Sequence, residues 1–238
     1  MSIHFWSFKM LLSGKTIEYI DNVTAVAAIA NIDAIVFTPT LVSGKDDTPS
    51  VVLIQTHDIP EFEFEELAII RIPYFRQRME AVKSASGKEF TIDYTPTSGL
   101  VIMKNGRTKA EYRAGNPAAV RPPKAMNDTP EFAFTIDQNL VTVIGRAASA
   151  YPSKDPMISF TSNGSEVEMT IMDDEAGDSF TSLISNDLDA EKNLNVRYSL
   201  KTLLPLLKHH DNTTLLIGGR GIMTLSIKGI QIGLIPRV

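Results

Sequence analysis

The sequence contains no cysteine among its 238 residues. Disulfide bonds, a thiol nucleophile and a thiolate metal site are therefore excluded. It also lacks an apolar run close to the roughly 18–20 residues of a membrane-spanning helix. Residues 1–12 lack the basic region and long apolar core of a signal peptide. These absences favour a soluble protein of a reducing, cytoplasmic compartment (the host cytoplasm if the chain is viral) with no membrane partner.

A surplus of positive charge is missing as well. The chain carries 23 Lys and Arg against 28 Asp and Glu, a formal net charge of −5. Because phosphate binding depends on Lys and Arg, this total argues against a nucleic-acid partner. The total is only a sum, however, and a protein that is acidic overall can still be basic along one surface. The distribution of charge decides the question.

The chain has enough apolar residues to build folded cores. Its hydrophobic content of 43% is too high for a disordered protein. Its length allows one large domain or two domains of about 100–150 residues.

The most informative pattern is a duplication. Helix-like and strand-like segments between Lys15 and Tyr112 recur in the same order between Asp137 and Pro236, displaced by roughly 123 residues. Identity between the halves is low, so the match lies in pattern and order. The matched segments are 34–38 with 157–161, 50–56 with 166–172, 70–83 with 196–209, and 98–102 with 220–224. A duplicated α+β unit without a catalytic cluster indicates architecture more than chemistry.

Four segments have the apolar spacing of helices. They are residues 16–30, residues 72–83, and the segments that follow Asp137 and Ser199, which are expected as N-caps. Proline at position 73 suits a first helical turn. The predicted apolar faces are Tyr19, Ile20, Val23, Val26, Ala27 and Ala30; Ile72, Phe75, Met79 and Val82; Leu140, Val143, Ile144, Ala147 and Tyr151; and Leu200, Leu203, Leu204 and Leu207.

Three of these helices expose more positive than negative charge. An ordinary solvated face explains any one of them, and only the repetition favours a surface laid across a phosphate backbone. The first helix opposes this interpretation, because Glu18 and Asp21 lie on its polar face.

The remaining apolar segments are predicted to be largely antiparallel strands, because short hairpin connections dominate. Residues 43–47 are interpreted as a turn. The expected strands are 34–38, 50–56, 61–71, 90–94, 99–104, 157–161, 167–172, 179–185, 193–198, 214–218, 221–227 and 231–235.

Residues 115–130 contain four prolines, which exclude a helix interior and a central strand. This extended segment is the best boundary between domains. The sequence therefore predicts domains at 1–114 and 132–238, connected by a loop at 115–131.

Enzyme-like patterns have simpler explanations. His209 and His210 are adjacent and diverge on a helix, so a solvated helix C-terminus is favoured over a metal site. The acidic residues Asp173, Asp174, Glu175 and Asp178 lack the spacing of a calcium loop. His57 and Asp58 have no nucleophile elbow beside them, and residues 218–221 suit a hairpin turn better than a phosphate loop. We expect no enzyme activity, no catalytic residues, no metal and no cofactor.

Three features together resemble one family. They are the C-terminal Gly-Leu-Ile-Pro-Arg-Val of residues 233–238, the Arg-Tyr-Ser-Leu-Lys-Thr-Leu of residues 197–203, and the proline-rich linker. Their order and spacing resemble the DNA sliding clamps, specifically the phage-type, two-domain relatives of proliferating cell nuclear antigen. Position 235 departs from the family's usual alanine. The resemblance implies a duplicated α+β clamp fold, with helices on the inner face and antiparallel sheets outside.

The resemblance also implies a homotrimeric ring around duplex DNA, which it encloses without reading sequence and on which it tethers DNA polymerase. A clamp-loader ATPase would be a further partner. Enclosure explains how a net-acidic protein can serve DNA, since weak, salt-sensitive contacts then suffice. The expected DNA contacts are Arg76, Arg78, Lys83, Arg146, Lys201 and Lys208.

Clamps hold partner peptides in an apolar pocket, which the resemblance places beside the C-terminal strand and beneath the linker. Core or loop packing explains these residues about as well. The expected pocket residues are Gln55, Thr56, His57, Ile59, Ala119, Val120, Pro122, Leu234, Ile235 and Pro236. Two other functions fit the same layout, namely a structural virion or scaffold protein and a monomeric processivity subunit that grips DNA by charge.

Overall fold

The computed structural model describes most of the chain. The described residues are 9–48, 50–63, 65–87, 89–120, 123, 128–151, 154–162, 166–173, 177–185, 193–211 and 214–237. Pro122, Asp174 and Glu175, named above, lie outside them. The chain divides into two compact units, one formed by residues 1–46 and 53–123 and the other by residues 47–52 and 124–238.

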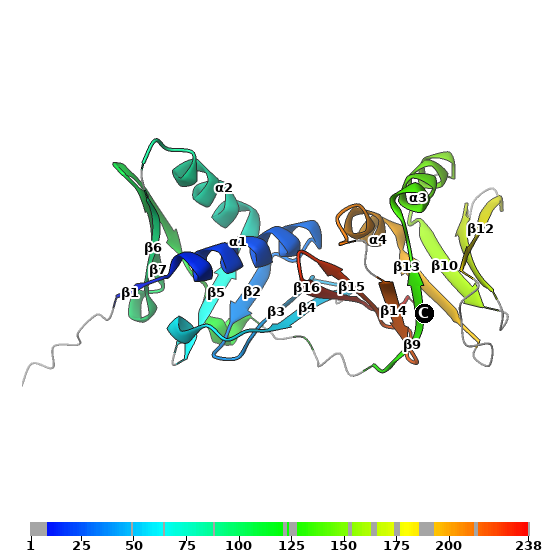
Figure 1. Cartoon of the computed structure of the whole chain (residues 1–238), viewed down its shortest axis with the longest axis horizontal. Coiled ribbons are helices and arrows are strands. Elements are labelled where there is room, and N and C mark those ends of the chain that lie inside the picture. The colour runs from blue at the N-terminus through cyan, green and yellow to red at the C-terminus, as the bar shows by residue number, and fades with distance from the viewer. Residues whose placement is uncertain are drawn as a thin grey trace, which may run out of the picture. The chain divides into compact units, whose positions relative to one another are not determined.

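The first unit contains two helices packed against antiparallel strands (Figure 1). Its strands form the orders β1-β6-β7-β8 and β5-β2-β3-β4. Ile92 on β6, for example, lies opposite Met103 on β7. The elements are β1 (Met10–Leu11), α1 (Gly14–Ile29), β2 (Ala34–Phe37), β3 (Leu41–Lys45), β4 (Val51–Thr56), η1 (Pro60–Phe62), β5 (Leu67–Ile70), α2 (Ile72–Lys83), β6 (Phe90–Thr95), η2 (Pro96–Ser98), β7 (Leu100–Asn105), β8 (Thr108–Arg113) and η3 (Pro117–Ala119).

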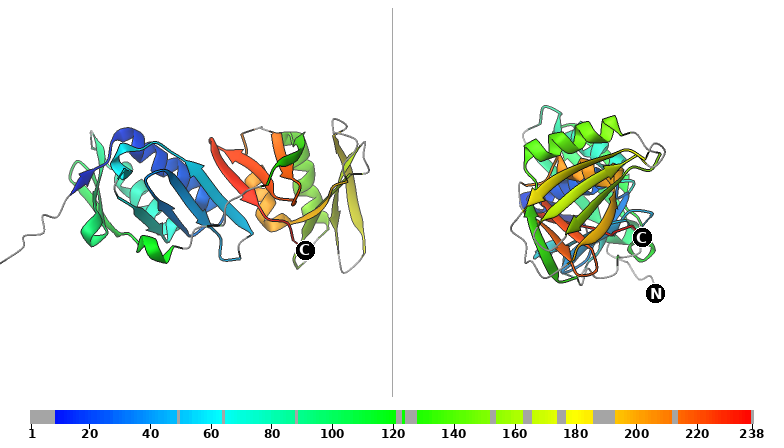
Figure 2. Two further views of the ribbon diagram at one scale, coloured as in Figure 1. Left: turned by 90° about the horizontal axis from the view of Figure 1, so that it is seen from below. Right: turned by 90° about the vertical axis from the view of Figure 1, so that its right-hand side faces the viewer.

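The second unit repeats this plan. Its strands form the orders β9-β14-β15-β16 and β13-β10-β11-β12, the second of which is seen face on in the right-hand view of Figure 2. Phe160 on β10 lies opposite Met169 on β11. The elements are β9 (Pro130–Thr135), α3 (Gln138–Ala150), β10 (Met157–Ser162), β11 (Val167–Met172), β12 (Ser179–Ser185), β13 (Asn195–Ser199), α4 (Leu200–Leu207), β14 (Thr214–Gly218), β15 (Met223–Ile227) and β16 (Ile230–Leu234).

The element order and the strand order are the same in both units. Each has one strand, a helix, four strands, a second helix and three strands, and each leading strand joins the three that close its unit. β8 is thus the counterpart of β16, and β12 is the counterpart of β4. The predicted duplication and the antiparallel α+β class are confirmed. One matched pair was wrong, because residues 50–56 contain β4, whose counterpart is β12, whereas residues 166–172 contain β11, the counterpart of β3.

Helix periodicity predicted much of the core correctly. α2 begins and ends as expected, and Ile72, Phe75, Met79 and Val82 are all buried. The Phe75 ring packs edge to face against Tyr112 of β8, with ring centroids 5.0 Å apart. The Asp137 carboxylate caps α3 by accepting a hydrogen bond from the Leu140 N–H at 2.7 Å. Ser199 occupies the N-cap position of α4, but its side chain makes no capping hydrogen bond.

Two helical faces are rotated from the prediction. In α3 Val143 is 37% exposed, whereas Val141 is buried. In α4 Leu206 is buried, and Leu204 is only half-buried. In each helix the buried face is displaced around the axis, so an apolar residue at one edge of the predicted face becomes more exposed and one beyond its opposite edge becomes buried.

Two strand predictions were wrong. Residues 43–47 were expected to form a turn, but residues 43–45 belong to strand β3 (Leu41–Lys45). Position 44 of this strand requires glycine, because the Cβ of any other residue would lie 2.7 Å from the Ala34 carbonyl oxygen. The strand predicted at residues 61–71 is shorter, because β5 spans only Leu67–Ile70. Residues 61 and 62 belong to the short helix η1, which begins at Pro60, and Glu61 accepts a hydrogen bond from the Ser13 N–H before α1.

Candidate functional site

Asp21 of α1 holds two of the expected DNA-contact residues in the first unit. Its Oδ1 lies 2.9 Å from Arg76 Nη1, and its Oδ2 is paired with Lys83 Nζ. Arg76 Nη1 also donates to the Asp21 carbonyl at 3.0 Å and to Thr24 Oγ1 at 3.2 Å. Burial would raise the pKa of Asp21, but Lys83 and Arg76 outweigh burial and hold it below its ordinary value. The carboxylate is therefore charged and shared by both cations.

Arg78, the third expected contact on α2, is placed differently. It is exposed, and its Nη1 donates to the Tyr74 carbonyl one turn earlier at 3.2 Å. The Tyr74 side chain is itself 56% exposed. Arg78 and Tyr74 therefore leave a cation and an aromatic ring on the outer surface of α2.

In the second unit the structure brings Arg146 and Lys208 together. Both are exposed, and both line a shallow groove of about 680 Å³ along α3. The other lining residues are small or polar, which leaves the groove accessible: Gln138, Val141, Thr142, Gly145, Ser149 and Ala150. Lys201 is exposed but does not line this groove, and its Nζ donates to the Lys154 carbonyl at 2.5 Å.

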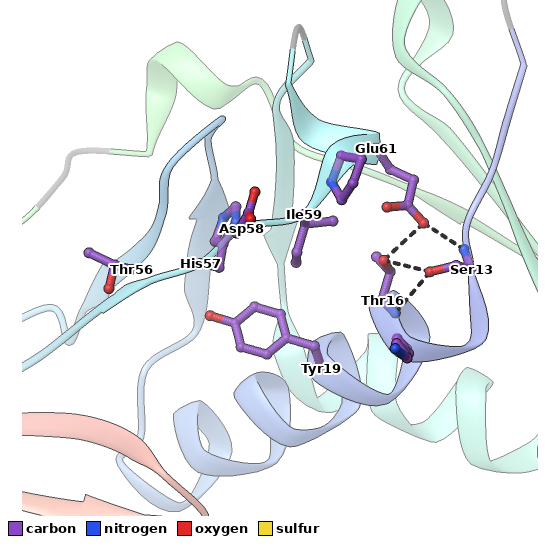
Figure 3. A pocket seen from close by; sticks show the side chains of 10 residues that line it. Ser13, Thr16, Tyr19, Thr56, His57, Asp58, Ile59 and Glu61 are labelled. Carbon is purple, nitrogen blue, oxygen red and sulfur yellow. Dashed lines mark hydrogen bonds between the residues drawn. The ribbon is translucent and has the colours of Figure 1, made fainter.

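A second cavity, of about 800 Å³, lies in the first unit between the start of α1 and the segment after β4 (Figure 3). Three of the expected pocket residues, Thr56, His57 and Ile59, line it. Sequence reasoning missed its other wall, because the start of α1 lies some forty residues earlier and only the fold brings it close. The lining residues not anticipated are Ser13, Lys15, Thr16, Tyr19, Asp58, Pro60 and Glu61.

The floor of this cavity is aromatic. Tyr19 projects from α1 towards His57, and the two rings meet edge to face with centroids 5.8 Å apart (Figure 3). The Tyr19 hydroxyl and both His57 ring nitrogens are shielded from solvent and lack a hydrogen-bond partner within the described residues. Burial raises the pKa of Tyr19 to about 12. Burial also lowers the pKa of His57, although the Leu41 and Thr38 carbonyls and Asp58 act in the opposite direction. Both side chains are therefore neutral at pH 7.

The rim of the cavity is fixed by Glu61. Its Oε1 accepts hydrogen bonds from the Ser13 N–H at 2.8 Å and from Thr16 Oγ1 at 2.9 Å. Burial would raise the pKa of Glu61, but these donors outweigh it and lower the pKa. The Ser13 hydroxyl also caps α1 by accepting from the Thr16 N–H at 3.3 Å.

The other expected pocket residues do not line this cavity. In the first unit Gln55 is half-buried and donates to the Thr56 carbonyl at 3.3 Å. Ala119, in η3, is exposed, and Val120 after it is half-buried.

In the second unit Leu234 is buried, Ile235 is 37% exposed and Pro236 is half-buried. The Ile235 N–H donates to the Ser50 carbonyl at 2.9 Å, within the same unit. Ser50 was not among the expected pocket residues. Of Leu234, Ile235 and Pro236, Ile235 has the largest exposed fraction and offers the most surface to a ligand.

The residues considered for metal or phosphate binding have structural roles. His210 is buried, contrary to the expected solvated position, and its Nε2 donates to the Ile136 carbonyl at 2.8 Å. The Asp173 N–H donates to the Asp178 carbonyl. The Gly221 N–H donates to the Gly218 carbonyl, so residues 218–221 form a turn. Among the described residues, no group of three or more His, Asp or Glu side chains is placed to hold a metal ion. Nor does any helix in these ranges combine the length and apolar character that a membrane crossing requires.

Comparisons with known proteins connect this arrangement to one fold. No protein-family model and no curated protein matches the sequence. Among solved structures, A. fulgidus PCNA bound to the C-terminal region of FEN-1 is 14% identical, with a TM-score of 0.61 over 97% of this chain and 98% of that one. The PCNA2–PCNA3 complex from Sulfolobus tokodaii is 13% identical, with a TM-score of 0.60 over 97% of this chain and 99% of that one.

The beta subunit of polymerase III from Caulobacter crescentus is 15% identical, with a TM-score of 0.70. This chain is covered completely but spans only 68% of that subunit. The fold implied by the C-terminal and linker residues is thereby confirmed: the chain has the fold of the DNA sliding clamps.

Proposed function

We propose that the protein is a DNA sliding clamp, a non-enzymatic processivity factor that encloses duplex DNA as a homotrimer and tethers DNA polymerase. The observation that carries the proposal is the match to PCNA chains along almost the full length of both partners. The identical plan of the two units supports it, because repeated units are the building blocks of a closed ring. Residues 115–131 would serve as the loop connecting the domains.

Strands at the edges of the sheets offer a surface through which copies of the chain could pair. β8 and β12 lie at the ends of their four-stranded sheets. Because each of these strands has one free edge, we infer that copies join by pairing β12 of one subunit with β8 of the next. An exposed sheet edge favours such pairing, and the described part of β12 carries no charge to prevent it.

DNA contact is assigned to the exposed cations of the helices. Arg146 and Lys208 are supported best, since they share one groove. Lys201 and Arg78 are exposed, while Arg76 and Lys83 are held by Asp21. These residues would contact phosphates without reading bases, so binding would be sequence-independent and salt-sensitive.

Partner binding is assigned to the expected pocket residues. A. fulgidus PCNA holds the C-terminal region of FEN-1, so a peptide ligand is the class we infer here. Exposed Ile235 and the cavity lined by Thr56, His57 and Ile59 offer apolar surface to such a peptide. A clamp-loader ATPase would open the ring and load it.

Native mass in solution separates this proposal from its alternatives. A trimer supports the clamp, a monomer supports the monomeric processivity subunit, and larger irregular assemblies support the virion protein. A sharper test replaces Leu183 of β12, which is 49% exposed, by glutamate. We expect L183E to dissociate the trimer without lowering the stability of the subunit, because burying an unpaired charge at the contact is costly.

The matched control is Met172→Glu, which places the same charge at a similarly exposed position, 43%, on the adjacent strand β11. Because β11 is paired on both sides, this variant should remain trimeric. Equal dissociation by both variants would contradict the assignment of β12 to the contact.

A further inference from the structure

Asp21 is an acidic residue on a surface whose proposed ligand is a polyanion. It pairs with both Arg76 and Lys83, and no other carboxylate among the described residues pairs with either of them. The side chains of Asp21, Arg76 and Lys83 are 26%, 25% and 29% exposed, respectively. They therefore remain within reach of solvent, and a phosphate group could compete for the two cations.

Among the described residues of the second unit, no acidic residue of α3 or α4 takes this position. α1 and α2 together carry four basic and three acidic side chains. α3 and α4 carry two basic side chains, Arg146 and Lys201, and no acidic ones, and Lys208 follows as the C-cap of α4. Within the described ranges, no salt bridge joins Arg146 or Lys208 to a carboxylate. The same helix pair thus presents neutralised cations in one repeat and accessible cations in the other.

We propose that Asp21 limits the affinity for DNA: it weakens the DNA contact of the first unit by competing with phosphate for Lys83 and Arg76. The inference rests on the proposed clamp function. It assigns to Asp21 the task of keeping a ring mobile on DNA, because a ring that cannot fall off needs contacts that exchange readily. DNA contact then comes mainly from the second unit.

The two cations are held unequally, which sharpens the inference. Without the Asp21 carboxylate, Arg76 retains the Asp21 carbonyl and Thr24 Oγ1 as acceptors. Lys83 loses its only hydrogen-bond acceptor within the described residues and keeps just the face of Phe90, with Nζ 5.6 Å from the ring centroid. Removing the carboxylate should therefore free Lys83 more than Arg76.

The test measures binding of the full-length protein to a short, blunt DNA duplex by fluorescence anisotropy over a range of salt concentrations. Asp21→Asn should raise the affinity roughly threefold or more at low salt and steepen the salt dependence by about one counterion. The matched control is Glu18→Gln, which removes one negative charge from an exposed position of the same helix. Glu18→Gln should raise the affinity for DNA by less than half of the gain that Asp21→Asn gives.

The dependence on Lys83 distinguishes a released cation from a general change of charge. Adding Lys83→Gln to Asp21→Asn should remove most of the gain in affinity and in salt slope. In the unmodified protein, Lys83→Gln should weaken binding less than Lys208→Gln does, a comparison that does not require Asp21→Asn to fold. Equal gains from Asp21→Asn and Glu18→Gln, or equal losses from Lys83→Gln and Lys208→Gln, would overturn the inference.

The same measurements separate this inference from the function on which it rests. If Lys208→Gln weakens DNA binding while Asp21→Asn gains no more than its control, the role of Asp21 fails and the clamp function stands. If no variant alters DNA binding, both fail.

Discussion

The two helix pairs of this protein share one topology and differ in their surface charge. In the first unit, Asp21 ties Arg76 and Lys83 to α1. In the second, Arg146 and Lys208 share an open groove. Duplicated units must keep the buried face that defines their fold, but their exposed faces can diverge without loss of stability. The comparison teaches that a matching fold does not imply equal contributions to ligand binding.

The largest effect should come from the groove of the second unit. Replacing Arg146 and Lys208 together by glutamate should weaken DNA binding roughly tenfold or more and reduce the salt slope by about one for each residue. Processive synthesis on a primed template should fall in parallel. Arg107→Glu, at an exposed position in the turn between β7 and β8 of the first unit, is the control for a change of charge outside the groove. Normal processivity of the double variant would show that the second unit does not carry the contact.

A second prediction tests the orientation of α3. Val141→Thr should lower the free energy of unfolding by about 1–3 kcal/mol, because it buries a hydroxyl group in the core. Val143→Thr should change it by less than about 0.5 kcal/mol, because Val143 lies at the surface. Urea denaturation measures both values. If Val143→Thr lowers the free energy of unfolding more than Val141→Thr does, the helical face predicted from the sequence is the correct one.

A third prediction compares the helix caps of the two units. Ser13→Ala and Asp137→Ala each remove the side-chain acceptor at a helix N-terminus. Each should cost about 0.5–2 kcal/mol in urea denaturation. Ser13→Ala leaves intact the bond from the Ser13 N–H to Glu61, so it should not cost more than Asp137→Ala. A larger loss from Ser13→Ala would mean that the rim of the cavity contributes to the stability of the first unit.

The smallest effect concerns acid stability. The pKa of Asp21 is lowered in the folded protein, so its contribution is fully present above the ordinary value of about 4 and is lost as the pH falls through the lowered pKa. Asp21→Asn should therefore flatten the decline of stability below about pH 4. Thermal unfolding across this pH range measures the difference.

Asp211 provides the matched comparison in the second unit. Burial would raise the pKa of Asp211, but the N–H groups of Gly229 and Lys228 and the hydroxyl of Ser226 lower it. Asp211→Asn should flatten the acid decline as well. An unchanged pH profile for Asp21→Asn alone would show that its ion pairs do not stabilise the helix pair.

Much of the fold was determined by the sequence alone. The period of apolar residues located all four helices, and the repeated order of segments predicted a duplicated α+β protein. The burial of Ile72, Phe75, Met79 and Val82 followed from the same period. Local signals of this kind depend on residues close in sequence, which is why they could be interpreted without a structure.

The tertiary structure decided what lies between distant residues. The charge of Asp21 was visible in the sequence, but its pairing with Arg76 and Lys83 joins helices more than fifty residues apart. The wall of the cavity near His57, the contact of Ile235 with Ser50 and the burial of His210 have the same origin. A sequence specifies which side chains carry charge or apolar surface, whereas folding alone determines which of them meet, because packing brings together residues that the chain keeps far apart.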